Sequence, residues 1–267
     1  METDLLNLKG EAKGKVDLPK IFSTPFRPDL IHRVYVALST HSLQPQGRDP
    51  EAGERTSAES WGVGRGAARM ARVKGGGTGR ANKAAGVASV VGGRIPHPPR
   101  SEKRIRKEVN RKERRLAIAS AIAATVERQI VSLRGHQVAD VKSFPVVLVD
   151  NVEKISKTSE LRDLFRVLNL SDDVERSARV RKARSGKSRM RGRTIRSGRG
   201  PLIVVAEDKG IGKAVDNLPG VECVLARDLT VTDLAPGSHP GRLVVWSESA
   251  LGALPKPLLE VGELVAT

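Results

Sequence analysis

The sequence predicts an α/β protein whose open, mostly parallel sheet is flanked by helices on both sides, interrupted by one long loop. Short apolar, β-branched runs at 144–149, 202–206, 221–226 and 243–246 alternate with segments of helical periodicity. Parallel strands joined by helices give this alternation, and strands buried on both faces read as continuous apolar runs. Residues 44–100 show neither period. We therefore expect a Rossmann-like three-layer domain with an extended, irregular insertion.

The region before the insertion is expected to form a hairpin and a helix. Residues 5–8 and 16–21 are separated by glycines, a pattern that favours a short hairpin. From Pro28 onward, apolar residues recur at helical spacing until the pattern stops at His41. The apolar positions of this helix are Leu30, Ile31, Val34, Tyr35 and Leu38. Inside the insertion itself, only a short turn at 67–72 is expected.

A long helix is expected at 101–135. Ser101 is a good N-cap, and Gly135 is a typical helix end. In the first half, glutamates lie four residues before basic residues, a spacing that supports a helix. These pairs are Glu102 with Arg106 and Glu108 with Lys112. The second half is apolar at Leu116, Ile118, Ile122, Val126 and Ile130. This helix would be polar at one end and buried at the other.

Further helices are expected between the strands. Residues 161–168 have one apolar face, and Asp172 with Glu175 resembles a capping box for the next helix. Shorter helices are expected at 213–217, 228–234 and 248–253. Residues 1–43 and 101–267 would thus form one globular domain. The insertion at 44–100, which we call the arm, would lie outside it.

The positive charge of the chain is concentrated in two segments. The net charge is +17 over 267 residues, and the isoelectric point is near 10.5. Residues 61–100 contain ten glycines, eight Lys or Arg, and no acidic residue. Residues 176–200 contain eleven Lys or Arg and no acidic residue. These nineteen cations exceed the net charge of the chain, so the remainder is nearly neutral. Such clustering is typical of proteins that bind phosphate backbones.

The composition of these segments favours folded RNA as the ligand. The arm cannot bury enough apolar surface to offset the entropy of ordering it, so it should become ordered only against a large polyanion. A solvated, disordered run is the alternative. Glycine lets the backbone approach phosphates closely, and arginine, which predominates, binds them with two hydrogen bonds. The arm is too irregular for a groove-reading helix. With 3% aromatic residues, a base-stacking platform is not expected.

A nucleotide cofactor site is the competing hypothesis. The glycines at 62–66 and 75–79 follow no strand, so they do not match a dinucleotide fingerprint. Gly210 and Gly212 follow an apolar strand and precede Lys213, which is a better match. However, Ala214 stands where a P-loop needs Ser or Thr, and the first glycine of that motif is missing. The glycines are more simply a strand-to-helix turn with positive φ. The alternative function is an RNA-modifying enzyme on a nucleotide-binding fold.

Catalytic and metal chemistry receive little support. The five histidines are scattered, and none has metal-ligand spacing with Cys223. His97 is expected to contact phosphate or to pack within the arm. Asp150 follows a strand, where an enzyme could place a carboxylate, but capping of the following turn is favoured. We therefore expect no enzyme activity, no cofactor and no metal.

Location is indicated by three absences. A single cysteine excludes an internal disulfide and favours a reducing compartment. No amino-terminal stretch resembles a signal peptide. The longest apolar run, at 116–126, is far shorter than the about 20 residues that cross a bilayer. A soluble, cytoplasmic protein is expected.

Four motifs carry a resemblance to a known family. They are RVKGGGTGRA at 72–81, VVGGRIPHPPR at 90–100, SGKSRMRGR at 185–193 and SWGVGRGAARMARVKGGG at 60–77. With these motifs, the sequence resembles the universal large-subunit ribosomal protein L-four family, in its archaeal and eukaryotic branch. The resemblance extends over nearly the whole chain, and little else combines KGGGTGR with GGR and HPP.

The resemblance implies a structural, non-catalytic protein of the large ribosomal subunit. An α/β body would lie on the outside of the subunit, and the arm would pass through ribosomal RNA to the wall of the nascent-peptide exit tunnel. The arm tip, residues 72–80, would lie near the tunnel constriction opposite the L-twenty-two family protein. The second basic loop, 184–200, would bind RNA or proteins special to archaeal and eukaryotic ribosomes.

The expected RNA contacts lie in both basic segments. In the arm they are Arg65, Arg69, Arg72, Lys74, Gly75, Gly76, Gly77, Thr78, Gly79, Arg80, Lys83, Arg94, His97 and Arg100. In the second segment they are Arg181, Lys182, Arg184, Lys187, Arg189, Arg191, Arg193, Arg196 and Arg199. The glycines at 75–79 would let the tip pass through a narrow gap in the RNA.

Overall fold

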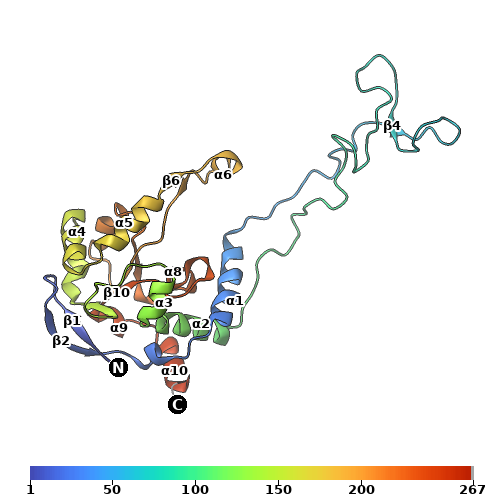
Figure 1. Ribbon diagram of the computed structural model, residues 1–267. Coiled ribbons are helices and arrows are strands. Elements are labelled where there is room, and N and C mark those ends of the chain that lie inside the picture. Colours follow the sequence, from blue (N-terminus) through green and yellow to red (C-terminus); the bar gives the residue numbers. More distant parts are fainter. Residues whose placement is uncertain (266–267) are drawn as a thin grey trace. The chain divides into compact units, whose positions relative to one another are not determined.

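The computed structural model describes residues 1–265 and divides the chain into two units (Figure 1). The body comprises Met1–Ser39 together with the chain from Glu108 onward. The arm unit is Thr40–Lys107. The sequence placed the corresponding limits at residues 43 and 101, a few residues inside the arm unit.

The body contains a six-stranded sheet in the order β2-β1-β5-β10-β8-β9. Only the β1–β2 pair is antiparallel, and the other neighbouring strands are parallel. The strands are β1 (Glu2–Leu6), β2 (Ala12–Asp17), β5 (Val146–Leu148), β8 (Leu202–Val205), β9 (Glu222–Leu225) and β10 (Val244–Ser247). The predicted mostly parallel α/β sheet and its four apolar strands are confirmed.

Helices cover both faces of this sheet, so the three-layer arrangement is confirmed as well. Successive strand residues alternate between two apolar cores: Val147 faces one core, and Val146 and Leu148 face the other. The first core is packed by α1 (Pro28–Ser39), α2 (Arg111–Ala123), α8 (Val231–Leu234), α9 (Glu248–Gly252) and α10 (Lys256–Val265). The second is packed by α3 (Arg128–Leu133), α4 (Thr158–Val167), α5 (Ser171–Val180) and α7 (Ile211–Asp216). The largest fully buried side chain, Trp246, meets Phe22 edge-on at 5.3 Å.

Within residues 1–265, five short 3-10 helices lie between these elements. They are η1 (Lys20–Ser23), η2 (Thr40–Ser42), η3 (Asp150–Lys154), η4 (Ala226–Asp228) and η5 (Pro236–Ser238). The predicted amino-terminal hairpin and the helix after Pro28 are confirmed, with the strands displaced by a few residues. The helices expected near 161–168, 213–217, 228–234 and 248–253 are also present.

The prediction of one helix over 101–135 is wrong. Residues 101–110 form no helix; α2 begins at Arg111, and a turn at 124–127 separates it from α3. At this break, Thr125 Oγ1 donates to the carbonyl of Ile122 over 2.6 Å. Glutamate–lysine pairs contribute only a few tenths of a kcal/mol each. A charged segment without an apolar face therefore gains too little from them to offset the cost of helix formation.

Two smaller local predictions are also wrong. Helix α5 begins at Ser171 with no side-chain cap, and Asp172 lies inside its first turn, so no capping box forms there. A capping box does form at α8, where Thr230 and Asp233 bond reciprocally. The turn expected at 67–72 is absent, because residues 67–71 are irregular and Arg72 begins a strand.

The second basic segment is more regular than expected. Strands β6 (Lys182–Ala183) and β7 (Ile195–Arg196) pair antiparallel, and α6 (Gly186–Met190) lies between them. We call residues 181–196 the basic hairpin. It follows α5 directly and extends away from the sheet (Figure 1). The cations of this segment are thus displayed on a hairpin and not on an unstructured loop.

Candidate nucleic-acid interface

The middle of the arm contains a small hydrogen-bonded frame. Strands β3 (Ala58–Glu59) and β4 (Arg72–Val73) pair antiparallel. On the other side of β4, the Val73 amide donates to the Lys83 carbonyl over 2.9 Å. The Ala85 amide donates to the Ala71 carbonyl over 3.0 Å. Three chain segments therefore lie side by side at the base of the tip, and backbone hydrogen bonds hold their register.

Arg72 belongs to this frame. Its guanidinium lies 5.0 Å from the centre of the Trp61 ring, a cation–π contact. The same group donates to the Asn82 carbonyl over 3.0 Å. The side chain is half-buried, whereas the other seven cations of residues 61–100 are exposed. This geometry gives Arg72 a structural role in closing the tip, and the phosphate contact expected of Arg72 stays a prediction.

Two further arm cations have acidic partners. Lys74 forms an ion pair with Glu59, and Arg94 lies 3.5 Å from Glu54. Both partners come from the preceding leg of the arm. The described residues hold no ion pair for the remaining five cations, which are all exposed. These are Arg65, Arg69, Arg80, Lys83 and Arg100. His97 and Thr78 are exposed as well.

The arm glycines divide into two groups. Gly53 has φ +87°, and an added Cβ would lie 2.5 Å from the carbonyl of Gly93, so the two legs approach closely there. At the tip, by contrast, an added Cβ on Gly75, Gly76 or Gly79 would meet nothing within 4 Å. Gly75 has a φ of +94°, a conformation that favours glycine, whereas Gly76 and Gly79 do not have a positive φ. Nothing within the described chain gives Gly76 and Gly79 a steric reason to be glycine.

The basic hairpin displays an unpaired set of cations. Its backbone is held by the Arg184 amide, which donates to the Thr194 carbonyl over 2.8 Å. Arg184 Nε also donates to the Ile195 carbonyl over 3.2 Å. Seven exposed cations of the hairpin have no ion pair among the described residues: Arg181, Lys182, Lys187, Arg189, Arg191, Arg193 and Arg196. They remain available to an external polyanion.

The root of the basic hairpin is fixed to the body by buried charges. Arg199 pairs with Glu222, and the same carboxylate accepts from the fully buried Arg242 over 2.7 Å. Arg176 donates to the Arg199 carbonyl over 2.7 Å and pairs with Asp173 over 2.9 Å. Burial lowers the pKa of Arg242 to about 10, which leaves it cationic at neutral pH. The base of the hairpin is therefore anchored.

The comparison with protein families decides the identity of the chain. The model of the "Ribosomal protein L4/L1 family" matches residues 16–256. The chain belongs to this family. Three curated proteins named "Large ribosomal subunit protein uL4" are similar to it. That of Methanopyrus kandleri is 47% identical over 260 residues, which is 97% of this chain and 100% of the relative. That of Saccharolobus solfataricus is 45% identical over 258 residues, 96% and 95% of the two chains. That of Methanosphaera stadtmanae is 43% identical over 251 residues, 94% and 95%.

In this ribosomal protein, the turn that resembled a cofactor site is occupied by the chain itself. Asp208 Oδ1 accepts hydrogen bonds from the amides of Gly210 over 2.9 Å and Gly212 over 3.1 Å. These bonds lower the pKa of the Asp208 carboxyl. Gly210 has φ +131°, as expected, but Gly212 does not have a positive φ. A larger residue at position 212 would clash, because an added Cβ would lie 2.6 Å from Asp208 Oδ2. A phosphate would find these amides already bonded to an anion.

A second carboxylate fills the same edge of the sheet. Glu153 is 1% exposed and accepts from the Ala206 amide over 3.0 Å and from Ser249 Oγ over 2.9 Å. Burial opposes ionisation of Glu153, but these hydrogen bonds outweigh it and lower its pKa. Asp150 accepts from the Ser249 amide over 2.7 Å. It therefore caps α9, so the prediction that it caps the turn after it is wrong.

Within residues 1–265 no helix is long and apolar enough to cross a membrane. The same residues hold no cluster of three or more His, Cys, Asp or Glu arranged to hold a metal ion. Burial, together with nearby carboxylates, raises the pKa of Cys223 to about 12, so its thiol stays neutral.

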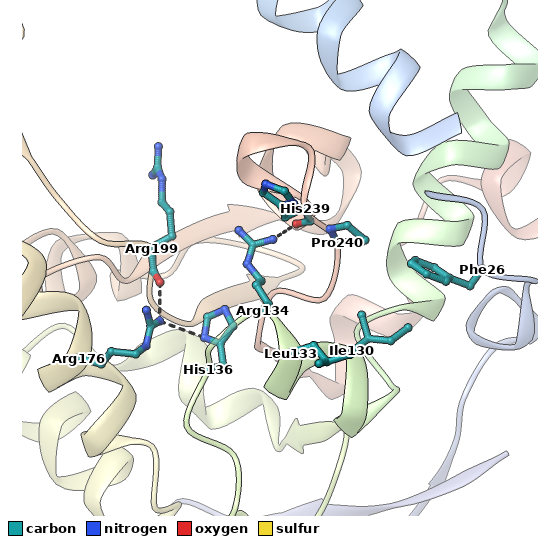
Figure 2. A pocket seen from close by; sticks show the side chains of 9 residues that line it. All are labelled: Phe26, Ile130, Leu133, Arg134, His136, Arg176, Arg199, His239 and Pro240. Atoms are coloured by element: carbon teal, nitrogen blue, oxygen red, sulfur yellow. Dashed lines mark hydrogen bonds between the residues drawn. The ribbon is translucent and has the colours of Figure 1, made fainter. Parts of the chain in front are cut away.

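Two cations at the root of the basic hairpin were not predicted from the sequence as site residues. Arg134 follows α3, and Arg176 lies in α5, with His136 between them in space (Figure 2). Arg176 falls within the acid-free segment 176–200, which was the only available signal. Arg134 gives no such signal, because it is an isolated cation that the fold brings to this place.

Proposed function

We propose that the chain is a structural, non-catalytic constituent of the large ribosomal subunit and binds large-subunit ribosomal RNA. Family membership and the names of the curated relatives support this proposal. The observation that carries it is the distribution of free charge. Five exposed cations in the arm and seven in the basic hairpin have no acidic partner among the described residues. Each lies in a segment with little apolar core of its own.

The arm would help to form the wall of the nascent-peptide exit tunnel. Its tip, residues 72–80, would lie near the tunnel constriction, across from the L-twenty-two family protein. The Arg72–Trp61 contact would keep the base of the tip narrow. Gly76 and Gly79, which have no steric reason within the chain, would then be explained by close approach of RNA. The basic hairpin would make the second anchor on RNA.

The occupied sheet edge supports a non-enzymatic role. In open α/β sheets, ligands bind outside the carboxyl ends of the strands. Here Asp150, Glu153 and Asp208 use the backbone amides at that edge. An RNA-modifying enzyme with a cofactor at residues 210–213 would need those donors. Binding of an adenine cofactor that is lost on Lys213→Ala, measured by calorimetry, would restore the enzyme hypothesis.

The experiment that tests the proposal compares the arm, at Arg80 of the tip and the adjoining Lys83, with the body. We expect a double variant, Arg80→Glu with Lys83→Glu, to be washed from isolated cytoplasmic large subunits at high salt, because it places two anions against phosphates. The matched control is Arg162→Glu with Arg166→Glu, which reverses two exposed cations on α4. Quantitative mass spectrometry of the washed subunits measures retention. Equal retention of both variants would refute RNA binding by this part of the arm.

A further inference from the structure

A cleft of about 590 Å³ lies in the body beside the root of the basic hairpin (Figure 2). One wall, which we call the cationic wall, contains Arg134, Arg176 and Arg199, and His239 lies next to it. Arg199 comes just before β8, and His239 comes shortly before β10. The cleft therefore lies toward the amino ends of the parallel strands. This is the edge opposite the one that Glu153 and Asp208 occupy.

On the cationic wall Arg176 is paired with Asp173 and Arg199 with Glu222, so the charge without a carboxylate partner is that of Arg134. Arg134 donates to the carbonyls of His239 and Pro236, and the described chain places no carboxylate within ion-pair distance of it. Burial and repulsion from Arg242, Arg176 and Arg199 lower the pKa of Arg134 to about 10. It is still a cation at neutral pH, held among other cations. An anion in the cleft would relieve this repulsion.

The opposite wall of the cleft is apolar and open to solvent. Leu133 is 87% exposed and Phe26 is 38% exposed, with Ile130 between them (Figure 2). Phe26, Ile130 and Leu133 thus line one wall together, and adjoining exposed apolar residues, in contrast to single ones, mark a surface that a partner covers. The ring of Phe26 offers a flat face of the kind on which nucleobases stack.

We propose that this cleft binds an unpaired nucleotide of ribosomal RNA, with its phosphate at Arg134 and Arg176 and its base against Phe26 and Leu133. The inference rests on the proposed RNA-binding function and adds a third contact, on the body itself. Arg199 joins the cleft to the basic hairpin, so an RNA strand that follows the hairpin leads into it. An arginine without a carboxylate partner on one wall and an aromatic ring on the other suit a nucleotide better than the single carboxylate of a protein side chain.

A photo-crosslinker placed in the cleft tests this assignment. Leu133 would be replaced by p-benzoylphenylalanine in the full chain, because its high exposure makes the change compatible with folding. The same residue at Val63, 75% exposed in the arm, reports on the proposed function separately. After irradiation of intact large subunits, nuclease and protease digestion identify the crosslinked partner. We expect both positions to crosslink to RNA.

Background substitutions then connect the crosslink to the cations. Arg134→Gln should reduce the yield from position 133 at least tenfold, whereas Arg166→Gln, on α4 outside the cleft, should leave it unchanged. RNA crosslinks at 63 combined with a protein crosslink or none at 133 would overturn the nucleotide assignment and leave the proposed function standing. Absence of RNA crosslinks at both positions would overturn both. An unchanged yield with Arg134→Gln would overturn the phosphate contact.

Discussion

Neutralising the basic hairpin should change the salt dependence of RNA binding by a calculable amount. The variant replaces the seven unpaired hairpin cations by glutamine, which keeps side-chain length similar and removes charge. The replaced residues are Arg181, Lys182, Lys187, Arg189, Arg191, Arg193 and Arg196. The structure identifies these seven because Arg184 and Arg199 are bonded to the chain itself. The variant should therefore retain the anchored root of the hairpin.

The magnitude follows from counterion release. Each phosphate contact contributes about −0.7 for single strands and about −0.9 for duplexes to the slope of log K against log salt. Five arm cations and seven hairpin cations give a slope of about −8 to −11 if all contact phosphates. The variant keeps only the five arm cations, so its slope should be about −3.5 to −4.5. The difference, about 5 to 6, does not depend on contacts elsewhere, since both proteins keep them.

The assay is fluorescence anisotropy with large-subunit ribosomal RNA fragments at several KCl concentrations. A control replaces seven exposed cations of the body that lie outside the hairpin and the cleft. They are Lys9, Lys13, Lys15, Lys154, Lys157, Arg162 and Arg166. The control should change the slope by less than about 1. A hairpin variant whose slope differs from that of the unmodified protein by less than about 2 would refute the assignment of these side chains to phosphates.

Three other outcomes are expected. Gly76→Ala should leave thermal unfolding unchanged, because the new methyl meets nothing in the chain. It should nevertheless lower incorporation into subunits at least about fivefold if RNA encloses the tip, a cost of about 1 kcal/mol; normal incorporation would contradict that enclosure. Cys223 should resist iodoacetamide at pH 8 until the protein is denatured, since its pKa is raised to about 12. Burial lowers the pKa of His136, so acidification below about 6.5 protonates the unfolded state first. Stability should fall by at most about 1.4 kcal/mol per pH unit, and less steeply in His136→Gln. Asp173, whose pKa is also lowered, loses its contribution only at more acidic pH.

Most of the body could be predicted because its strands are buried on both faces. Such strands give continuous apolar runs, and β5, β8 and β10 are buried along their whole length. Helix α10 was missed, because Pro257 and Gly262 argue against a helix. Pro257 lies in the first turn, where proline is tolerated. Gly262 is required by a distant contact, since an added Cβ would lie 2.6 Å from the backbone of Ile21.

The candidate RNA-binding segments could be predicted only from their amino-acid composition. Runs of Arg, Lys and Gly indicate a phosphate-binding segment, but they do not show which cations the chain already uses. Arg72 is held by Trp61, and Lys74 is held by Glu59, through pairing between the legs of the arm. The cleft at Arg134 and Arg176 depends on topology, because these residues lie 42 positions apart in the sequence. Local pattern contains no information on such contacts.

Charged side chains are distributed unequally between the two edges of the sheet. Carboxylates of Glu153 and Asp208 lie toward the carboxyl ends of the strands, and Arg134, Arg176 and Arg199 lie toward the amino ends. The excess positive charge of the body lies in the basic hairpin, which leads into the amino end of β8, so the body carries a dipole moment along its strands. In the field of an RNA surface, a dipole experiences a torque that turns its positive end inward before any contact forms. Orientation would thus be selected during the approach, and fewer encounters would begin from the wrong face.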